Sequence, residues 1–182
     1  MLIQEGLSKL KTIRKRMQDI RGDVREFSVW NSKIKHPWGI KGGNQDYNIK
    51  EAEQVARSKI QSYHDLKNEF LRIKTAIDRT NIQTKITVAG KEFTLHEAIL
   101  YKREVAEMLQ ELVGNYEHCA LKVKRDVDRE NEKDNVSVKS DVIYLFPSDE
   151  VEKTRKFINE FLEEVDGKMQ IANATVNLIF DE

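Results

Sequence analysis

The sequence is poor in the residues that mark secreted and membrane proteins. Its 182 residues contain one cysteine, Cys119, so no disulfide can form within the chain. The N-terminus lacks the apolar stretch of a signal peptide. No window approaches the ~20 apolar residues that cross a bilayer. We therefore expect a cytoplasmic protein with no membrane partner.

A net charge is also lacking, because 31 basic side chains balance 31 acidic ones. No field of the whole protein attracts nucleic acid, and nucleic acid is not the expected partner. Hydrophobic residues are only 39% of the chain and charged residues 34%. This balance is typical of thin helical bundles with large solvated faces, whereas compact enzymes usually contain more apolar residues and more glycine.

Motifs of catalysis and metal binding are missing as well. The four histidines have no common metal-ligand spacing, and Cys119 has no second cysteine for zinc. The glycine-rich nucleotide-binding patterns and the Gly-x-Ser-x-Gly elbow do not occur. His118 and Cys119 are neighbours on a predicted helix, so their side chains point about 100° apart. We expect no enzyme, no cofactor and no metal.

What the sequence has is hydrophobic residues repeated every seven positions. Ile3, Leu10, Met17 and Val24 form such a series, and a second series runs three places later through Ile13, Ile20 and Phe27. This pattern is that of a coiled-coil seam. A second helix is predicted from 49 to 79. It should pack antiparallel on the first, so that 1–80 form a helical hairpin with an irregular loop at 30–48.

The second half of the chain alternates strand and helix signals. A β ribbon is predicted at 81–93 around Ala89 and Gly90, and a helix at 94–134 that begins with the capping pair Thr94 and Glu97. A strand at 136–146 should pair with the ribbon, and a C-terminal helix should occupy 148–180. The helix at 94–134 has a predicted buried seam: Ala98, Val105, Leu109, Leu112, Tyr116, Cys119 and Val123. The C-terminal helix has an apolar face: Ile158, Phe161, Leu162, Val165, Met169 and Ala172.

The predicted fold is mainly α: a single helical domain over 1–182, with about four long antiparallel coiled-coil helices and a small sheet of two to three strands.

The loop at 30–48 contains both tryptophans of the protein, three lysines and a glycine-rich turn. Such a loop could bind anions or stack bases, which would make a single-stranded nucleic-acid binder. The alternative is that the tryptophans pack against the helix ends or a neighbouring subunit, and we favour this contact surface. The predicted interaction residues are Trp30, Lys33, Lys35, His36, Trp38 and Lys41.

Three blocks together resemble a known family. They are the stretch Ile77 to Thr84, the helix start at Phe93, Thr94 and Leu95 with Ala98 and Arg103, and the terminal run from Val165 to Asn173. The chain resembles the small helical bacterial and phage proteins of unknown function often named septicolysin. This resemblance implies a helical fold, a tendency to oligomerise and, for a phage-encoded chain, a location in the host cytoplasm.

Polar residues of these blocks have a structural and a functional interpretation. They can bond to the backbone and to helix neighbours. Alternatively they converge where two helices and the ribbon meet, in a donor-rich pocket for a phosphate-bearing small molecule. The candidate ligand-binding residues are Arg79, Asn81, Thr84, Arg103, Gln170 and Asn173.

The sequence thus leaves several functions open. The leading prediction is a non-catalytic homo-oligomer, because thin helices with period-seven seams cannot all be covered within one chain. It would act as an assembly or interaction protein, or as a virion-associated component. The alternatives are a binder that sequesters a phosphate-bearing nucleotide signal and a single-stranded nucleic-acid binder.

Overall fold

The computed structural model describes residues 1–29, 49–132 and 141–180, and the chain is mainly helical with a small antiparallel sheet of two strands, as predicted. Coiled-coil packing stays a prediction. The chain divides into two compact units. Unit 1 combines Met1–Thr80 with Asn173–Glu182, and unit 2 is Asn81–Ala172. Each unit is described by itself below.

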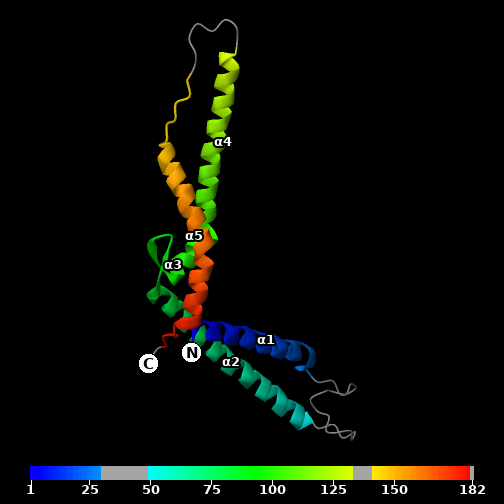
Figure 1. Cartoon of the computed structure of the whole chain (residues 1–182). Helices are drawn as coiled ribbons and strands as arrows, with labels where there is room; N and C mark the ends of the chain where they lie inside the picture. Colours follow the sequence, from blue (N-terminus) through cyan, green and yellow to red (C-terminus); the bar gives the residue numbers. More distant parts are fainter. Residues whose placement is uncertain (30–48, 133–140, 181–182) are drawn as a thin grey trace. The chain divides into compact units, whose positions relative to one another are not determined.

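Unit 1 contains helix α1 (Ile3–Phe27) and helix α2 (Ile49–Gln83). Figure 1 shows these helices close together at the start of α1 and farther apart toward residue 49. Burial follows the same trend, since the first half of each α1 seam is buried and the second half is only partly covered. The core of unit 1 therefore lies at one end of the pair. Its main buried residues are Ile3, Leu10, Ile13, Ile73, Ala76, Ile77, Thr80 and Leu178.

The two ends of the chain meet in this core. The Ile3 N–H donates to the Val176 carbonyl at 3.0 Å, and the Leu178 N–H donates to the Met1 carbonyl at 2.8 Å. The hydroxyl of Thr80, fully buried, accepts a bond of 2.9 Å from the Ile179 N–H. We call this set of bonds the terminal clasp. It corrects the predicted helix at 148–180, because residues 176–180 leave the helix to pair with the N-terminus.

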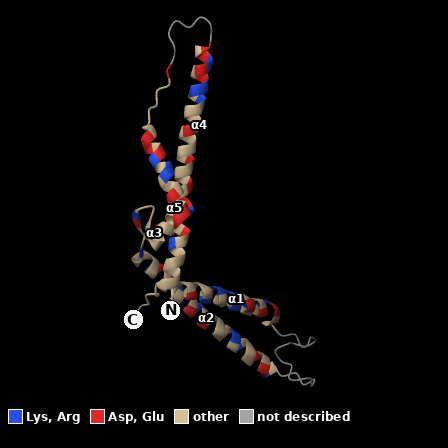
Figure 2. Cartoon of the chain, in the orientation of Figure 1, with Lys and Arg blue, Asp and Glu red and all other residues tan. Residues whose placement is uncertain are grey.

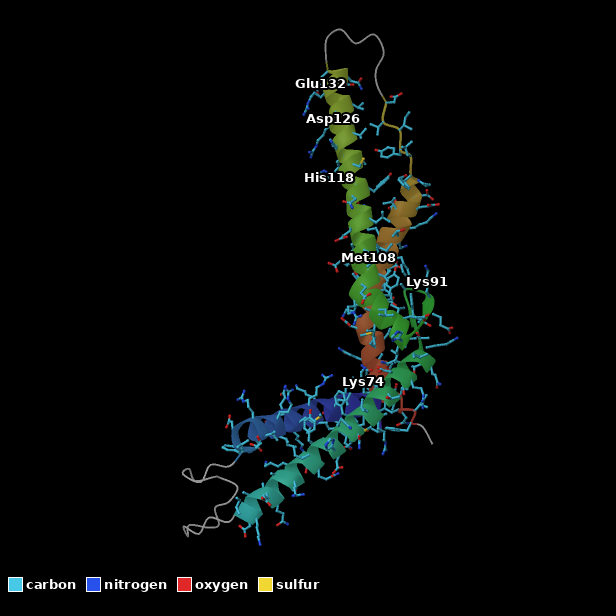
Figure 3. The ribbon with its side chains drawn as sticks, turned by 180° about the vertical axis from the view of Figure 1, so that it is seen from behind. Lys74, Lys91, Met108, His118, Asp126 and Glu132 are labelled. Carbon is cyan, nitrogen blue, oxygen red and sulfur yellow. The ribbon has the colours of Figure 1, made fainter. Side chains whose placement is uncertain are left out.

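Unit 2 begins with the predicted ribbon, strands β1 (Lys85–Val88) and β2 (Lys91–Thr94). Gly90 has the predicted positive φ, and Ala89 shares it, at 48°. The ribbon packs on helix α5 (Ser148–Thr175) through a cluster of buried residues: Val88, Ala98, Phe161 and Val165. The α5 face is buried or half-buried as predicted. Lys91, marked in Figure 3, places its ammonium 4.1 Å from the centre of the Phe157 ring.

The third long helix is continuous but changes its winding. It runs through α3 (Leu95–Leu100), the π-helical turn η2 (Tyr101–Val105) and α4 (Ala106–Asn131). The capping pair at its start is confirmed, because the Thr94 hydroxyl accepts from the Glu97 N–H and the Glu97 carboxylate accepts from the Thr94 N–H. A π turn inserts one extra residue into the helix. The buried positions after Ala98 are accordingly Ala106 and Val113, eight and fifteen residues later, each one residue beyond a repeat of seven.

This one-residue shift makes part of the predicted buried seam wrong. Val105, Leu112, Cys119 and Val123 were expected in the core, but all four are exposed. One residue rotates an α-helix by about 100°, so the extra residue turns these side chains out of the buried face. Cys119 is therefore an exposed thiol and not a buried structural cysteine.

The predicted strand at 136–146 is also corrected where the structure describes it. Residues 141–146 form no strand, and the sheet of unit 2 consists of β1 and β2 in the described chain. The apolar residues of this run instead lie against α4, where Tyr144 and Phe146 each contact the Tyr116 ring at a centroid distance of 6.5 Å. Residues 133–140, and the loop at 30–48, lie outside the described residues.

Candidate protein-interaction groove

A groove of ≈ 660 Å³ lies in unit 2 between α4 and the chain that leads into α5. Figure 1 shows the segment at 141–147 descending beside α4 toward α5. One wall is contributed by α4: Leu112, Val113, Asn115, Tyr116, Cys119, Ala120 and Val123. The other wall is contributed by the segment and α5: Val142, Ile143, Tyr144, Leu145, Phe146, Glu150, Val151 and Thr154. We call this the unit 2 groove.

The walls of the unit 2 groove are apolar and open to solvent. Leu112 is 63% exposed on α4, while Ile143 and Leu145 are 79% and 91% exposed on the facing segment. Phe146 is 70% exposed beside them. In Figure 2 the segment beside α4 is mostly tan, the colour of uncharged residues, whereas the far end of α4 is mostly red and blue. Isolated exposed hydrophobic residues are ordinary, whereas a contiguous patch of them marks a binding surface.

The floor of the groove holds an unusual polar group. The hydroxyl oxygen of Tyr116 is buried and has no hydrogen-bond partner in the described part of the chain. The Tyr116 ring lies between Tyr144, tilted by 37°, and Phe146, nearly perpendicular at 84°. Burial of a hydroxyl without a partner costs about 1–3 kcal/mol.

Glu150 is the one charged residue among the described residues that line the groove, and other charged residues are its neighbours in sequence. Arg155 of α5 forms an ion pair with Glu117 of α4, which links the two walls. On α5 the Lys153 ammonium lies 2.9 Å from the Asp149 carboxylate. This hydrogen bond lowers the pKa of Asp149 and raises that of Lys153, with the attraction between their charges adding to both shifts. Both groups therefore stay ionised at neutral pH.

The six predicted ligand-binding residues are divided between the units. Arg79 and Asn173 belong to unit 1, and the other four to unit 2, so their convergence stays a prediction. The Arg103 guanidinium pairs with the adjacent Glu104, and Gln170 is exposed on α5. The Thr84 carbonyl accepts a bond from the Leu95 N–H at the start of α3. None of the six lines the unit 2 groove or the two grooves of unit 1.

The six residues of the tryptophan loop lie outside the described residues, so their proposed contacts stay predictions. They are Trp30, Lys33, Lys35, His36, Trp38 and Lys41. Within 1–29, 49–132 and 141–180, no group of three or more His, Cys, Asp or Glu side chains is placed to hold a metal ion. None of the helices in these ranges has the length and apolar character of a membrane span.

Unit 1 has two grooves of a different kind between α1 and α2. One, of ≈ 490 Å³, is lined largely by charged residues, among them Arg16, Asp19, Asp23 and Glu69. Lys59 crosses it to pair with Asp23. The second, of ≈ 690 Å³, contains Arg21, Arg25 and Tyr63. Neither offers the continuous apolar surface of the unit 2 groove.

The sequence contained a signal for the unit 2 groove that the strand prediction misinterpreted. Val142, Ile143, Tyr144, Leu145 and Phe146 are five consecutive apolar residues, whereas a half-buried strand alternates apolar and polar positions. An uninterrupted run whose residues point in all directions needs cover on more than one side. In this chain α4 covers one side, and the rest stays exposed.

Comparisons with known proteins define no class for the chain. No known protein family matches it, and no curated protein matches its sequence. A crystal structure described as that of a functionally unknown conserved protein from Corynebacterium diphtheriae is similar over 98% of this chain and 99% of that chain. The identity is 15% and the TM-score is 0.49. The resemblance to septicolysin proteins stays a prediction.

Proposed function

We propose that this chain is a non-catalytic assembly component that binds another polypeptide through the unit 2 groove. The observation that carries the proposal is the contiguous exposure of Leu112, Ile143, Leu145 and Phe146 around the groove. At such fractions, large side chains expose on the order of 100 Å² each. The patch then reaches several hundred Å², the size of the largest apolar patch on a typical monomer, and such patches are often functional.

The shape of the groove favours a polypeptide over a small ligand. Its two walls are a helix and an irregular segment, and the large apolar side chains that line them stay exposed to solvent. Small-molecule sites usually bury most of their ligand in a concave pocket. Protein interfaces instead combine an apolar centre, rich in aromatic residues, with a charged rim. Tyr116, Tyr144 and Phe146 supply the aromatic centre, and the residues around Asp149 supply the rim.

Photo-crosslinking in cells tests this proposal directly. A photoreactive amino acid at Leu145, in the groove, should yield crosslinks to a polypeptide that mass spectrometry then identifies. The matched control places the same group at Leu121, which is 55% exposed on α4 but does not line the groove. We expect abundant crosslinks from position 145 and few from position 121. Equal or absent crosslinking at both positions would contradict the proposed function.

The binder of a phosphate-bearing small molecule remains the second proposal, supported by the donor-rich set predicted from the sequence. It makes a different prediction, because such a ligand would be retained as added mass. Native mass spectrometry of protein purified from its own host detects that mass. A retained ligand that disappears in the Arg79→Ala variant and stays in Leu145→Ala would favour this second function over assembly.

A further inference from the structure

We infer that the occupant of the unit 2 groove is a second copy of this chain, related by a twofold axis that runs along the groove. This inference rests on the proposed function and names its partner. With the axis in this direction, α4 of each copy lies against residues 142–146 and the start of α5 of the other. The same patch is then used twice, as in all isologous dimers.

The first support is the spacing of the exposed residues on α4. Val105, Leu112 and Cys119 recur every seven residues, and Tyr116 and Val123 repeat at the same interval four places later. This is the spacing of a seam that packs against another long element. Leu112, Cys119 and Val123 of this seam are exposed because the π turn directs burial to Ala106 and Val113 instead. Figure 3 marks Met108, His118 and Asp126, which follow one another along this length of helix.

The second support is the area of the patch. In one copy the exposed apolar surface amounts to several hundred Å², and pairing covers it in both copies together. Standard stable interfaces bury roughly 1,200–2,000 Å² in total, so the charged residues beside the groove would have to contribute the remainder. The patch therefore supplies the apolar centre of such an interface, and the charged residues supply its rim.

The third support is the distribution of charge along the two walls. Residues 122–125 of α4 contain three cations, Lys122, Lys124 and Arg125, around the groove residue Val123. Residues 149–152 of α5 contain three carboxylates, Asp149, Glu150 and Glu152, around the groove residue Val151. A twofold axis along the groove sets the α4 wall of one copy against the α5 wall of the other. Positive then meets negative on both sides of the interface.

Mass measurement by light scattering after size exclusion tests the partner. At micromolar concentration the wild type should have twice the chain mass of 21.3 kDa. Leu112→Asp should shift the dissociation constant upward by at least a hundredfold and give monomers, because it places a charge in the apolar centre. Leu121→Asp changes the same residue type on the same helix, outside the groove, and should leave the dimer intact. Circular dichroism of both variants checks that the helices persist.

A charge exchange tests the direction of the axis. Lys124→Glu and Glu152→Lys should each weaken self-association about tenfold, because each puts like charges together at both contacts. A mixture of the two variants should associate as the wild type does, since one contact then pairs the two new charges and the other pairs the two native ones. Failure of the mixture to associate, with both single variants weakened, would overturn the cross-wall arrangement.

The experiments distinguish a failure of this inference from a failure of the proposed function. A strictly monomeric wild type overturns the inference that the partner is a second copy, and crosslinks from Leu145 to a different protein would leave the proposed function standing. A dimer that Leu112→Asp does not change overturns the inference too, because self-association would then use another surface. Loss of the dimer in Leu112→Asp alone, together with recovery in the charge-exchanged mixture, supports it.

Discussion

Thr80 is the one fully buried polar residue among the described parts of the chain. Its hydroxyl donates to the Ala76 carbonyl at 2.7 Å and accepts from the Ile179 N–H at 2.9 Å. Thr80→Val keeps the shape and removes both bonds. We expect the free energy of unfolding to fall by about 1–3 kcal/mol, because the Ile179 amide loses its acceptor. Urea denaturation measures this change.

Thr80→Ser is the matched control for this prediction, because it keeps the hydroxyl and removes only a methyl group. Hydrogen exchange should show the Ile179 amide protected in the wild type and in Thr80→Ser, but exposed in Thr80→Val. If the valine variant keeps both its stability and this protection, the hydroxyl does not hold the terminal clasp.

Ala89 occupies a backbone conformation that suits glycine better. It has φ 48°, next to Gly90 at φ 71°, and left-handed conformations cost residues with a Cβ about 1 kcal/mol or more. Ala89→Gly should therefore raise the free energy of unfolding by roughly 0.5–1 kcal/mol. The bond of 3.0 Å from its N–H to the Glu164 carboxylate involves the backbone and should persist.

The neighbouring position gives the opposite expectation in the same turn. Gly90→Ala adds a Cβ to a second residue with positive φ and should lower stability by about 1 kcal/mol. Thermal unfolding of the two variants side by side compares them. Equal shifts in the same direction would show that the backbone of the turn relaxes and that φ at these residues does not control its stability.

At the scale of single elements, the capping pair of α3 links helix stability to pH. The Glu97 carboxylate accepts from the Thr94 N–H at 2.7 Å and from the Thr94 hydroxyl at 3.0 Å. The backbone bond, followed by the hydroxyl bond, lowers the pKa of Glu97 in the folded state. Its contribution is thus fully present above the ordinary glutamate value of 4.5 and is lost as pH falls through the lower folded-state pKa.

The measurable consequence is a difference between two pH profiles of the urea midpoint. Below pH 4.5 the wild type should lose stability more steeply than Glu97→Gln, which has no charge to lose. Thr94→Ala removes the hydroxyl donor and keeps the backbone N–H, so it should flatten the profile only in part, while costing about 1 kcal/mol as a lost cap. Parallel profiles for all three proteins would contradict a role of the Glu97 charge.

The third long helix shows how much of an element the sequence predicts. The Thr-x-x-Glu signal located its start within one residue, and the periodic apolar positions indicated its length. The π turn at Tyr101–Val105 was not predicted, because periodicity assumes uniform winding and one inserted residue leaves no mark in composition. That residue decides whether Val105 or Ala106 is buried, and hence where the unit 2 groove lies.

At the scale of the whole molecule, local sequence patterns predicted most helices and strands. They did not predict the features that depend on contacts between residues far apart in the sequence. The helices, the ribbon and its turn follow from neighbours in sequence. Two bonds of the terminal clasp join residues more than 170 positions apart and the third joins residues 99 apart, so no local pattern of Val176 or Leu178 could reveal it. For the same reason residues 142–146 were predicted as a strand: their β propensity is visible in the sequence, whereas the competing surface of α4 is not.

The terminal clasp also has a consequence for the order of folding during synthesis. Unit 2 is continuous in sequence, whereas unit 1 needs residues from both ends of the described chain. A ribosome that adds ~5–20 residues per second needs roughly another 5–20 s after Thr80 before Leu178 is made. Throughout that time Gly6 lacks Leu178, whose side chain lies against it in the folded protein. The helices α1 and α2 are therefore synthesised before unit 2 but packed completely only after it, and chaperones have that interval in which to act on them.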